Sequence, residues 1–105
     1  MSMPHADIKG KFSTIARLVA VEGKEQELKA LLAAVRHHSE GATEPLCLTY
    51  RTLQGAGSDV GVFTVFEEYA EREALVQHRT SEPYLALKNA GLIKEMSVNF
   101  FEEFQ

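Results

Sequence analysis

The sequence contains no tryptophan and only one cysteine, Cys47. A single cysteine cannot form an intrachain disulfide, so we expect the reducing environment of the cytoplasm. No apolar run approaches the roughly 20 residues that cross a bilayer. The net charge of −4 gives no electrostatic reason to expect a nucleic acid or a membrane as partner. The 105 residues are enough for one domain with its own hydrophobic core.

Metal and phosphate motifs are also missing. His37 and His38 are adjacent, so on a helix they point about 100° apart and cannot readily hold one ion together. The other histidines, His5 and His78, are remote in sequence, and no spacing typical of a zinc site exists. The glycine-rich stretch at 55–57 precedes a strand rather than a helix, which predicts a turn instead of a phosphate loop. The residues therefore predict no metal site.

Hydrophobic periodicity predicts a compact series of strands and helices after an irregular start. Residues 1–11 are polar, lack periodicity and contain Pro4 and Gly10, so we expect a flexible tail followed by a domain at 12–105. Apolar alternation with a period of two predicts strands, and a period of about 3.6 predicts helices. The expected strands are 12–21, 46–54, 62–69 and 93–104, and the expected helices are about 24–40 and about 71–89, the latter with a second start signal at 80–81.

The resulting order is β-α-β-β-α-β. With right-handed crossovers it predicts an α+β, ferredoxin-like fold, in which a four-stranded antiparallel sheet carries two helices on one face. The third strand is nevertheless apolar on both faces, and so is the last strand. A two-sided apolar sheet with helices on one side predicts a homodimer formed through the other side. The residues involved are Phe63 and Val65 against Val62 and Phe66, and Val98, Phe100 and Phe104 against Phe101, with the interface face of the last strand left open.

The junction between the third strand and the next helix holds the most plausible chemistry. Glu67 and Tyr69 end one strand face, and His78 shares the inward helix face with Ala74 and Leu75. An ordinary pKa of about 6.5 would leave much of His78 neutral and able to act as a base near pH 7. The alternative is a histidine that only forms hydrogen bonds within the core.

Glu67 needs a partner or a shifted pKa, because its strand neighbours are apolar. Arg17 and Arg51 are the predicted partners, and a structural ion pair is as plausible as a catalytic role. Tyr50 and Tyr69 could donate hydrogen bonds to a substrate, or could simply be core residues with solvated hydroxyls.

These residues resemble the antibiotic biosynthesis monooxygenase family over roughly residues 12–104. The similar features are Gly23-Lys24-Glu25 at a helix entry, Tyr50 on the second strand, Glu67 and Tyr69, Ala74 and His78, and Ser81 with Tyr84. The resemblance implies a dimeric α+β barrel. It also implies oxygen chemistry without a cofactor, although the family includes haem-degrading enzymes and an isomerase. Haem degradation is disfavoured, because this chain has Ala16 and Tyr69 where that branch has asparagine and tryptophan.

The function favoured by this resemblance is a small cofactor-independent monooxygenase that oxidises a phenolic, quinol-like or anthrone-like molecule with O2. An isomerase that moves a proton on a small carbonyl compound, and a non-catalytic binder of a hydrophobic molecule, remain alternatives. We expect an apolar cavity between the helices and the sheet. The predicted catalytic residues are His78, Tyr69 and Glu67, and the predicted substrate-binding residues are Tyr50, Phe63, Val65, Ala74, Leu75, Tyr84 and His38.

Overall fold

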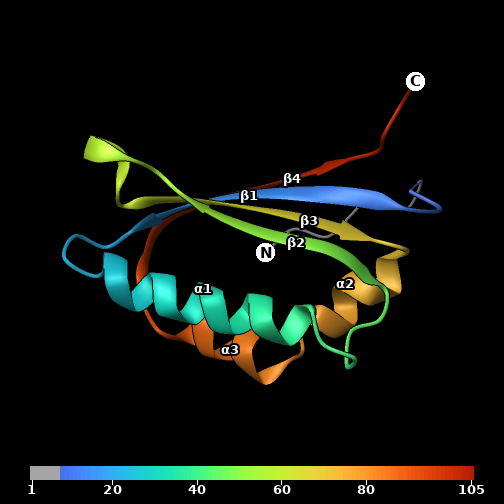
Figure 1. Cartoon of the computed structure of the whole chain (residues 1–105), viewed down its shortest axis with the longest axis horizontal. Coiled ribbons are helices and arrows are strands. Elements are labelled where there is room, and N and C mark those ends of the chain that lie inside the picture. The colour runs from blue at the N-terminus through green and yellow to red at the C-terminus, as the bar shows by residue number, and fades with distance from the viewer. Residues whose placement is uncertain (1–7) are drawn as a thin grey trace.

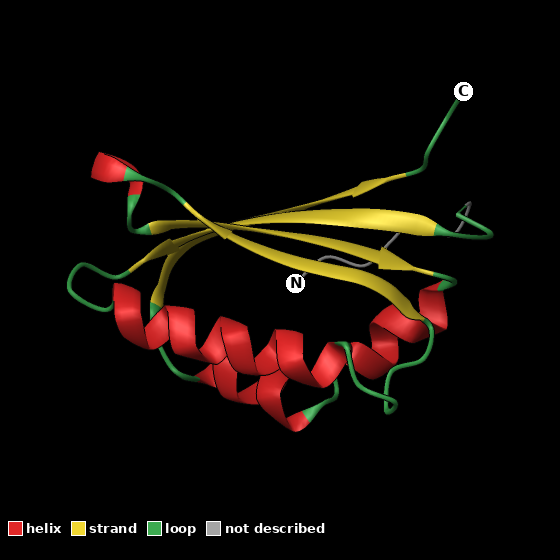
Figure 2. Cartoon of the chain, viewed as in Figure 1, coloured by secondary structure: helices red, strands yellow, loops and turns green. Residues whose placement is uncertain are grey.

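The computed structural model describes residues 8–105 and has two layers, a four-stranded antiparallel sheet and a layer of helices on one of its faces (Figures 1 and 2). The strand order is β2-β3-β1-β4. This confirms the predicted α+β, ferredoxin-like fold, with one more helix than expected. The elements are β1 (Phe12–Ala20), α1 (Glu25–Ser39), β2 (Cys47–Gln54), a 3-10 turn (Gly57–Asp59), β3 (Val62–Tyr69), α2 (Arg72–His78), α3 (Glu82–Asn89) and β4 (Ile93–Phe101).

The central strands β1 and β3 follow the predicted alternation. Every second residue of β3, from Phe63 to Tyr69, is buried against the helices. The antiparallel register places Ala16 opposite Val65 and Thr14 opposite Glu67. Because paired residues share a sheet face, this register brings the Glu67 carboxyl under the helix layer.

The second helical region is divided into α2 and α3. One continuous helix would need an N–H from Pro83 to bond to the carbonyl of Arg79, and proline has none. The chain instead leaves α2 after His78 and re-enters a helix after Ser81, whose backbone is extended at φ −69° and ψ 150°. This break places Tyr84 of α3 beside His78, with ring centroids 5.4 Å apart.

The buried side chains form two apolar clusters. The larger cluster joins α1, through Leu28, Leu32 and Val35, to the sheet and to α3. The smaller cluster lies near the start of β1 and joins the sheet to α2. It contains Ile8, Phe12, Tyr69, Ala74 and Leu75.

The ends of the domain differ from the prediction. Ile8 is buried, so packing begins before residue 12, whereas the rest of the predicted tail at residues 1–7 lies outside the described part of the chain. Strand β4 ends at Phe101 rather than at Phe104, and Phe104 is 92% exposed on a segment that leads away from the helices (Figure 1). Within residues 8–105, no helix is both long and apolar enough to cross a membrane.

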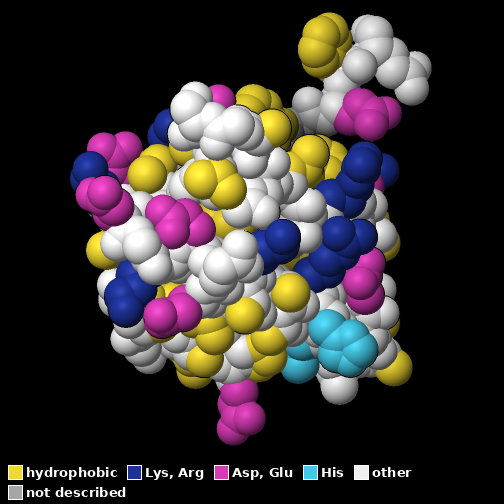
Figure 3. Space-filling view, turned by 60° about the vertical axis from the view of Figure 1, so that its left-hand side comes forward, with side chains coloured by type: hydrophobic (Ala, Val, Ile, Leu, Met, Phe, Trp, Pro, Cys, Tyr) yellow, Lys and Arg dark blue, Asp and Glu magenta, His cyan; other side chains and the backbone are white. Residues whose placement is uncertain are grey.

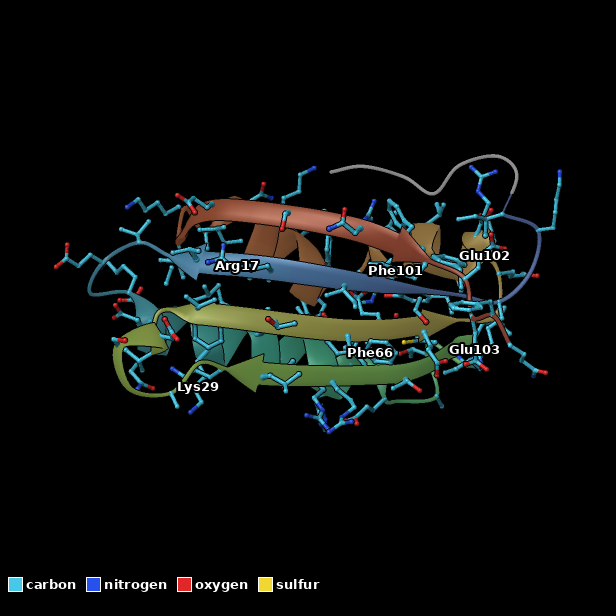
Figure 4. All side chains as sticks on the ribbon, turned by 90° about the horizontal axis from the view of Figure 1, so that it is seen from above. Arg17, Lys29, Phe66, Phe101, Glu102 and Glu103 are labelled. Carbon is cyan, nitrogen blue, oxygen red and sulfur yellow. The ribbon has the colours of Figure 1, made fainter. Side chains whose placement is uncertain are left out.

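The sheet face opposite the helices is uncovered, and we call it the open face. Figure 4 looks onto it and shows Arg17, Phe66 and Phe101 there. Strand pairing places Val98 opposite Ala16 on the helix side. Side chains alternate along a strand, so Phe101 at the end of β4 lies on the open face. The open face comprises Ser13, Ile15, Arg17, Val19, Arg51, Leu53, Val62, Thr64, Phe66, Glu95, Ser97, Asn99 and Phe101.

The core analysis predicts unequal effects of two leucine truncations. Leu28 is 0% exposed within the larger cluster, whereas Leu85 on α3 is 39% exposed. We expect Leu28→Ala to lower the free energy of unfolding by about 2–5 kcal/mol, because it removes buried methyl groups and leaves a cavity. Leu85→Ala should change it by about 0.5 kcal/mol or less. Urea denaturation of both variants measures the difference, and equal losses would contradict this description of the core.

Candidate functional site

His78 lies at the end of α2, where it is 1% exposed and surrounded by aromatic rings. Its ring centroid lies 5.3 Å from that of Tyr50 on β2, 5.8 Å from Tyr69 on β3 and 5.4 Å from Tyr84 on α3. Four elements therefore converge on one imidazole. The two nitrogens of this ring face different groups.

The Nδ1 atom of His78 faces a buried carboxylate. Oε1 of Glu44 lies 2.8 Å from it, and the Ser39 hydroxyl lies 3.1 Å from it. An ionised carboxylate oxygen can only accept a hydrogen bond, so this arrangement favours the neutral tautomer that carries its proton on Nδ1. The lone pair of that tautomer is on Nε2, on the other side of the ring.

Glu44 is held in place by the loop between α1 and β2. Its backbone N–H donates to the carbonyl of Gly41, and its own carbonyl accepts from Cys47. Its Oε2 atom is hydrogen bonded to Nδ1 of His38, and the Ser39 hydroxyl donates to the same oxygen at 3.5 Å. Both carboxyl oxygens are thus engaged, which compensates for the desolvation of a buried acid.

The Nε2 atom of His78 lies 3.8 Å from Oε1 of Glu67. The hydroxyl of Tyr69 donates to that same oxygen. Burial raises the pKa of Glu67 above its usual range, although His78, the Tyr69 hydroxyl and Arg79 act in the opposite direction. Burial also raises the pKa of Tyr69, with the negative charge of Glu67 adding to the shift. The Tyr69 hydroxyl therefore keeps its proton at neutral pH and remains a hydrogen-bond donor.

A cavity of about 30 Å³ lies between the helix layer and the sheet, next to His78. This volume is sufficient for only one or two water molecules, whereas pockets for drug-sized ligands measure about 300–1,000 Å³. Helix α3 packs mainly on α1, and Met96 on the helix side of β4 is exposed. Residues of both α3 and β4 contribute to the cavity wall. The walls of the cavity are Ala16, Leu18, Leu32, Val65, Leu87, Met96 and Val98, with Tyr50, Glu67, His78, Arg79 and Tyr84 as polar groups.

The structure brings half of the ten predicted site residues to the wall of this cavity. His78, Glu67, Tyr50, Val65 and Tyr84 line it, and Tyr69 contacts two of them without lining it.

The other predicted substrate-binding residues lie elsewhere. Ala74 and Leu75 pack in the smaller cluster, because the first part of α2 contacts that cluster and only its last residue, His78, reaches the cavity. Phe63 lies farther along β3 and packs in the larger cluster. His38 contacts Glu44 behind His78 rather than the cavity.

The predicted ion pair of Glu67 is wrong. Arg17 pairs with Thr64 and Arg51 pairs with Phe66, so both arginines lie on the open face, with the sheet between them and Glu67.

Glu44 and Ser39 were not among the predicted site residues. Glu44 lies between Gly41 and Pro45, which favour the end of a helix but carry no sign of a buried carboxylate. The one available signal was a carboxylate in a short loop after a pair of histidines, and it does not predict burial.

The described residues contain no group of three or more histidine, cysteine, aspartate or glutamate side chains placed to hold a metal ion. Cys47 is half-buried, and burial together with the charges of Glu44 and Glu67 raises its pKa to about 12. Its thiol therefore stays protonated at neutral pH and is a poor nucleophile.

The raised pKa of Glu67 predicts a pH-dependent effect of Glu67→Gln. A buried carboxyl whose pKa is higher in the folded than in the unfolded protein makes the folded state less stable as the pH rises. The loss begins near the unfolded pKa of 4.5 and continues through the folded pKa. The variant should therefore gain free energy of unfolding relative to wild type at pH 7–8 and gain much less at pH 4. Denaturant titrations at both pH values measure this, with Glu103→Gln on the exposed C-terminal segment as control. A gain confined to pH 4 would contradict the assignment.

Comparisons with known proteins agree on one family. The profile of the antibiotic biosynthesis monooxygenases matches residues 12–90, whereas no curated protein matches the chain.

Several solved structures share the fold. Rv0793 from Mycobacterium tuberculosis is similar with a TM-score of 0.79 and 28% identity, over 90% of this chain and 96% of that one. PA3566 from Pseudomonas aeruginosa has a TM-score of 0.83 and 22% identity, over 95% and 100%. A candidate antibiotic biosynthesis monooxygenase from Caulobacter crescentus has a TM-score of 0.78 and 21% identity, over 92% of each chain. With three quarters of its length matched by the family profile, this chain belongs to the antibiotic biosynthesis monooxygenase family.

Proposed function

We infer that the protein is a cofactor-independent monooxygenase that oxidises a phenolic, quinol-like or anthrone-like molecule with O2. The observation that carries this inference is the orientation of His78. Its Nδ1 atom lies 2.8 Å from Glu44, and its Nε2 atom lies 3.8 Å from Glu67, which lines the cavity together with His78. A buried base directed at a mostly apolar space suits a substrate that must lose a proton away from water.

The proposed reaction needs no electron source other than the substrate. Nε2 of His78 takes a proton from the substrate, and the resulting anion reduces O2. For an anthrone-like CH2 group, both C–H bonds are replaced by a C=O bond. One oxygen atom stays on the carbon, and the other leaves as water with the two hydrogens.

The tyrosines would stabilise the anion. Burial raises the pKa of Tyr50 and that of Tyr84, so both hydroxyls stay protonated and can donate to a developing negative oxygen. Tyr69 has a different role in this proposal, because it holds Glu67 rather than the substrate. The apolar walls of the cavity would accept the aromatic rings.

A proton-transfer isomerase acting on a small carbonyl compound is the second candidate. The observation that favours it is the 3.8 Å separation between Nε2 of His78 and the Glu67 carboxyl. Because the pKa of Glu67 is raised, these two groups form an acid and a base that could act on one substrate. A protein that only binds a hydrophobic molecule would need the walls but neither group.

Oxygen consumption separates these functions. We expect wild-type protein to accelerate O2 uptake by a naphthohydroquinone or an anthrone, and His78→Gln to slow it by about 10²–10⁴-fold, the usual worth of a general base. His37→Gln, on the exposed face of α1, is the matched control and should keep the wild-type rate.

Two results would reject the monooxygenase, and a third would reject only the role of His78. Proton exchange into a bound ketone without O2 uptake would support the isomerase. Binding of the quinol without either reaction would indicate a binder. An unchanged rate in His78→Gln would remove His78 as the base.

We further infer that two protomers associate through their open faces, as in a dimeric α+β barrel. Ile15 and Phe101 are exposed there, and Phe66 is partly buried. Arg17 and Glu95 also lie on this face, 4.0 Å apart. Apolar side chains at the centre of an uncovered sheet favour burial against a second sheet.

A charge placed on the open face tests this association. Phe66→Glu and Phe101→Glu should each shift the protein from dimer to monomer in sedimentation at micromolar concentration, because an unpaired carboxylate is costly to bury. Phe104→Glu, beyond the end of β4, should leave the dimer largely intact. A wild-type protein that sediments as a monomer would refute the proposal.

A further inference from the structure

We propose that Glu44 and His38 form a proton relay that connects the buried His78 with the surrounding water. The proposal rests on the role of His78 as the base of the proposed function. Its structural basis is a continuous chain of hydrogen bonds, from Nδ1 of His78 to Oε1 of Glu44 and from Oε2 of Glu44 to Nδ1 of His38.

The exposed fraction of the side chain rises along this series of hydrogen bonds, from His78 through Glu44 to His38. The side chains of His78 and Glu44 are 2% and 6% exposed, whereas that of His38 is 31% exposed. Figure 3 shows histidine side chains at the molecular surface. Among the described histidines, His37 and His38 are the two that reach solvent. The series of hydrogen bonds therefore begins at the cavity and ends in water.

The need for such a path arises once a ligand occupies the cavity. A ligand that fills the cavity blocks the Nε2 side of His78, and within residues 8–105 the hydrogen-bond partners of the other ring nitrogen are Glu44 and Ser39. The Ser39 hydroxyl donates to Oε2 of Glu44, so it holds the carboxylate in place. Glu67 lies on the Nε2 side of His78, and the three tyrosine rings lie beside the imidazole ring. Glu44 is thus the group placed to exchange a proton with Nδ1.

The relay can be written with all protons accounted for. At the start, His78 carries its proton on Nδ1, one proton is shared between Oε2 of Glu44 and Nδ1 of His38, and His38 carries another on Nε2. When Nε2 of His78 takes a proton from the substrate, its Nδ1 proton moves to Oε1 of Glu44. The shared proton then settles on Nδ1 of His38, and the Nε2 proton of His38 passes to water.

The return step reverses each transfer. The Nε2 proton of His78 goes to a negative oxygen of the product, while Oε1 of Glu44 gives its proton back to Nδ1. The shared proton moves back toward Oε2, and water supplies a proton to Nε2 of His38. His78 acts first as base and then as acid, and its ring carries no extra proton after the transfer to Glu44. The proton count returns to its starting value.

A measurement without substrate tests the relay directly. In protein with 15N-labelled histidine, the exchange of the His78 Nδ1 proton with water can be followed by saturation transfer. A positioned proton-transfer group is worth ~10²–10⁴-fold, so we expect His38→Ala to slow this exchange by at least about tenfold. The nitrogen shifts that report the His78 tautomer should stay unchanged. His37→Ala, one residue away on α1, should exchange like wild type.

Chemical rescue provides the second readout. With a naphthohydroquinone as substrate, His38→Ala should lose activity on the order of tenfold, less than removal of the base itself. Millimolar imidazole, which can occupy the vacated exposed position, should restore it in a concentration-dependent manner. Neither His37→Ala nor wild type should respond to imidazole.

Two outcomes would overturn the relay. One is equal Nδ1 exchange in wild type and His38→Ala, with His38→Gln as a second variant that preserves side-chain size. The other is a loss of activity that imidazole does not restore, which would assign His38 a purely structural role. If wild-type protein oxidises no quinol, the proposed function fails, and the exchange rates still decide the relay.

Discussion

The hydrogen bond between Glu44 and His78 is the interaction on which the site depends. It joins a loop after α1 to the end of α2, so it links two of the three helices that contribute to the cavity wall. Removal of one partner would leave a buried carboxylate or a buried imidazole without its main polar contact, a loss that usually costs about 1–3 kcal/mol or more. The same bond selects the tautomer of His78. One contact therefore contributes to stability and also sets which ring nitrogen of His78 is available to accept a proton.

A second polar pair lies on the other side of the imidazole. Glu67 and Tyr69 are two residues apart on β3, so the alternation of the strand places both on the helix side. The hydroxyl of Tyr69 satisfies one oxygen of Glu67 from the same strand. This local pairing, together with the positive charge of Arg79, helps to explain how a carboxylate is tolerated among apolar neighbours. The imidazole thus lies between two acids with different environments, one with both oxygens engaged and one next to the cavity.

The fold was predictable because its signals are local. The alternation of β3 and the change to a helical period after Tyr69 lie within short windows, and they place Glu67 and His78 correctly on the helix side. The prediction that Arg17 pairs with Glu67 was avoidable, because the alternation that buries Thr14 places Arg17 on the other face. The division of α2 from α3 was visible at Pro83.

Glu44 could not be predicted in this way. Its position depends on a loop whose conformation is fixed by contacts with His38, Ser39 and His78, and the last of these is 34 residues away. Loop residues carry no periodicity that reports burial. The packing of Ala74 and Leu75 away from the cavity has a similar origin, because it depends on where α2 meets the N-terminal residues such as Ile8.

The small size of the cavity affects how fast a ligand can bind. A space of about 30 Å³ cannot admit an aromatic ring, so the proposed aromatic substrate requires a form of the protein with a wider cavity. If that form is a minor population, the apparent affinity falls by the fraction of molecules that are open. Association would then be limited by the rate of opening rather than by diffusion. Selectivity would depend as much on the ease of this movement as on the contacts made after closure.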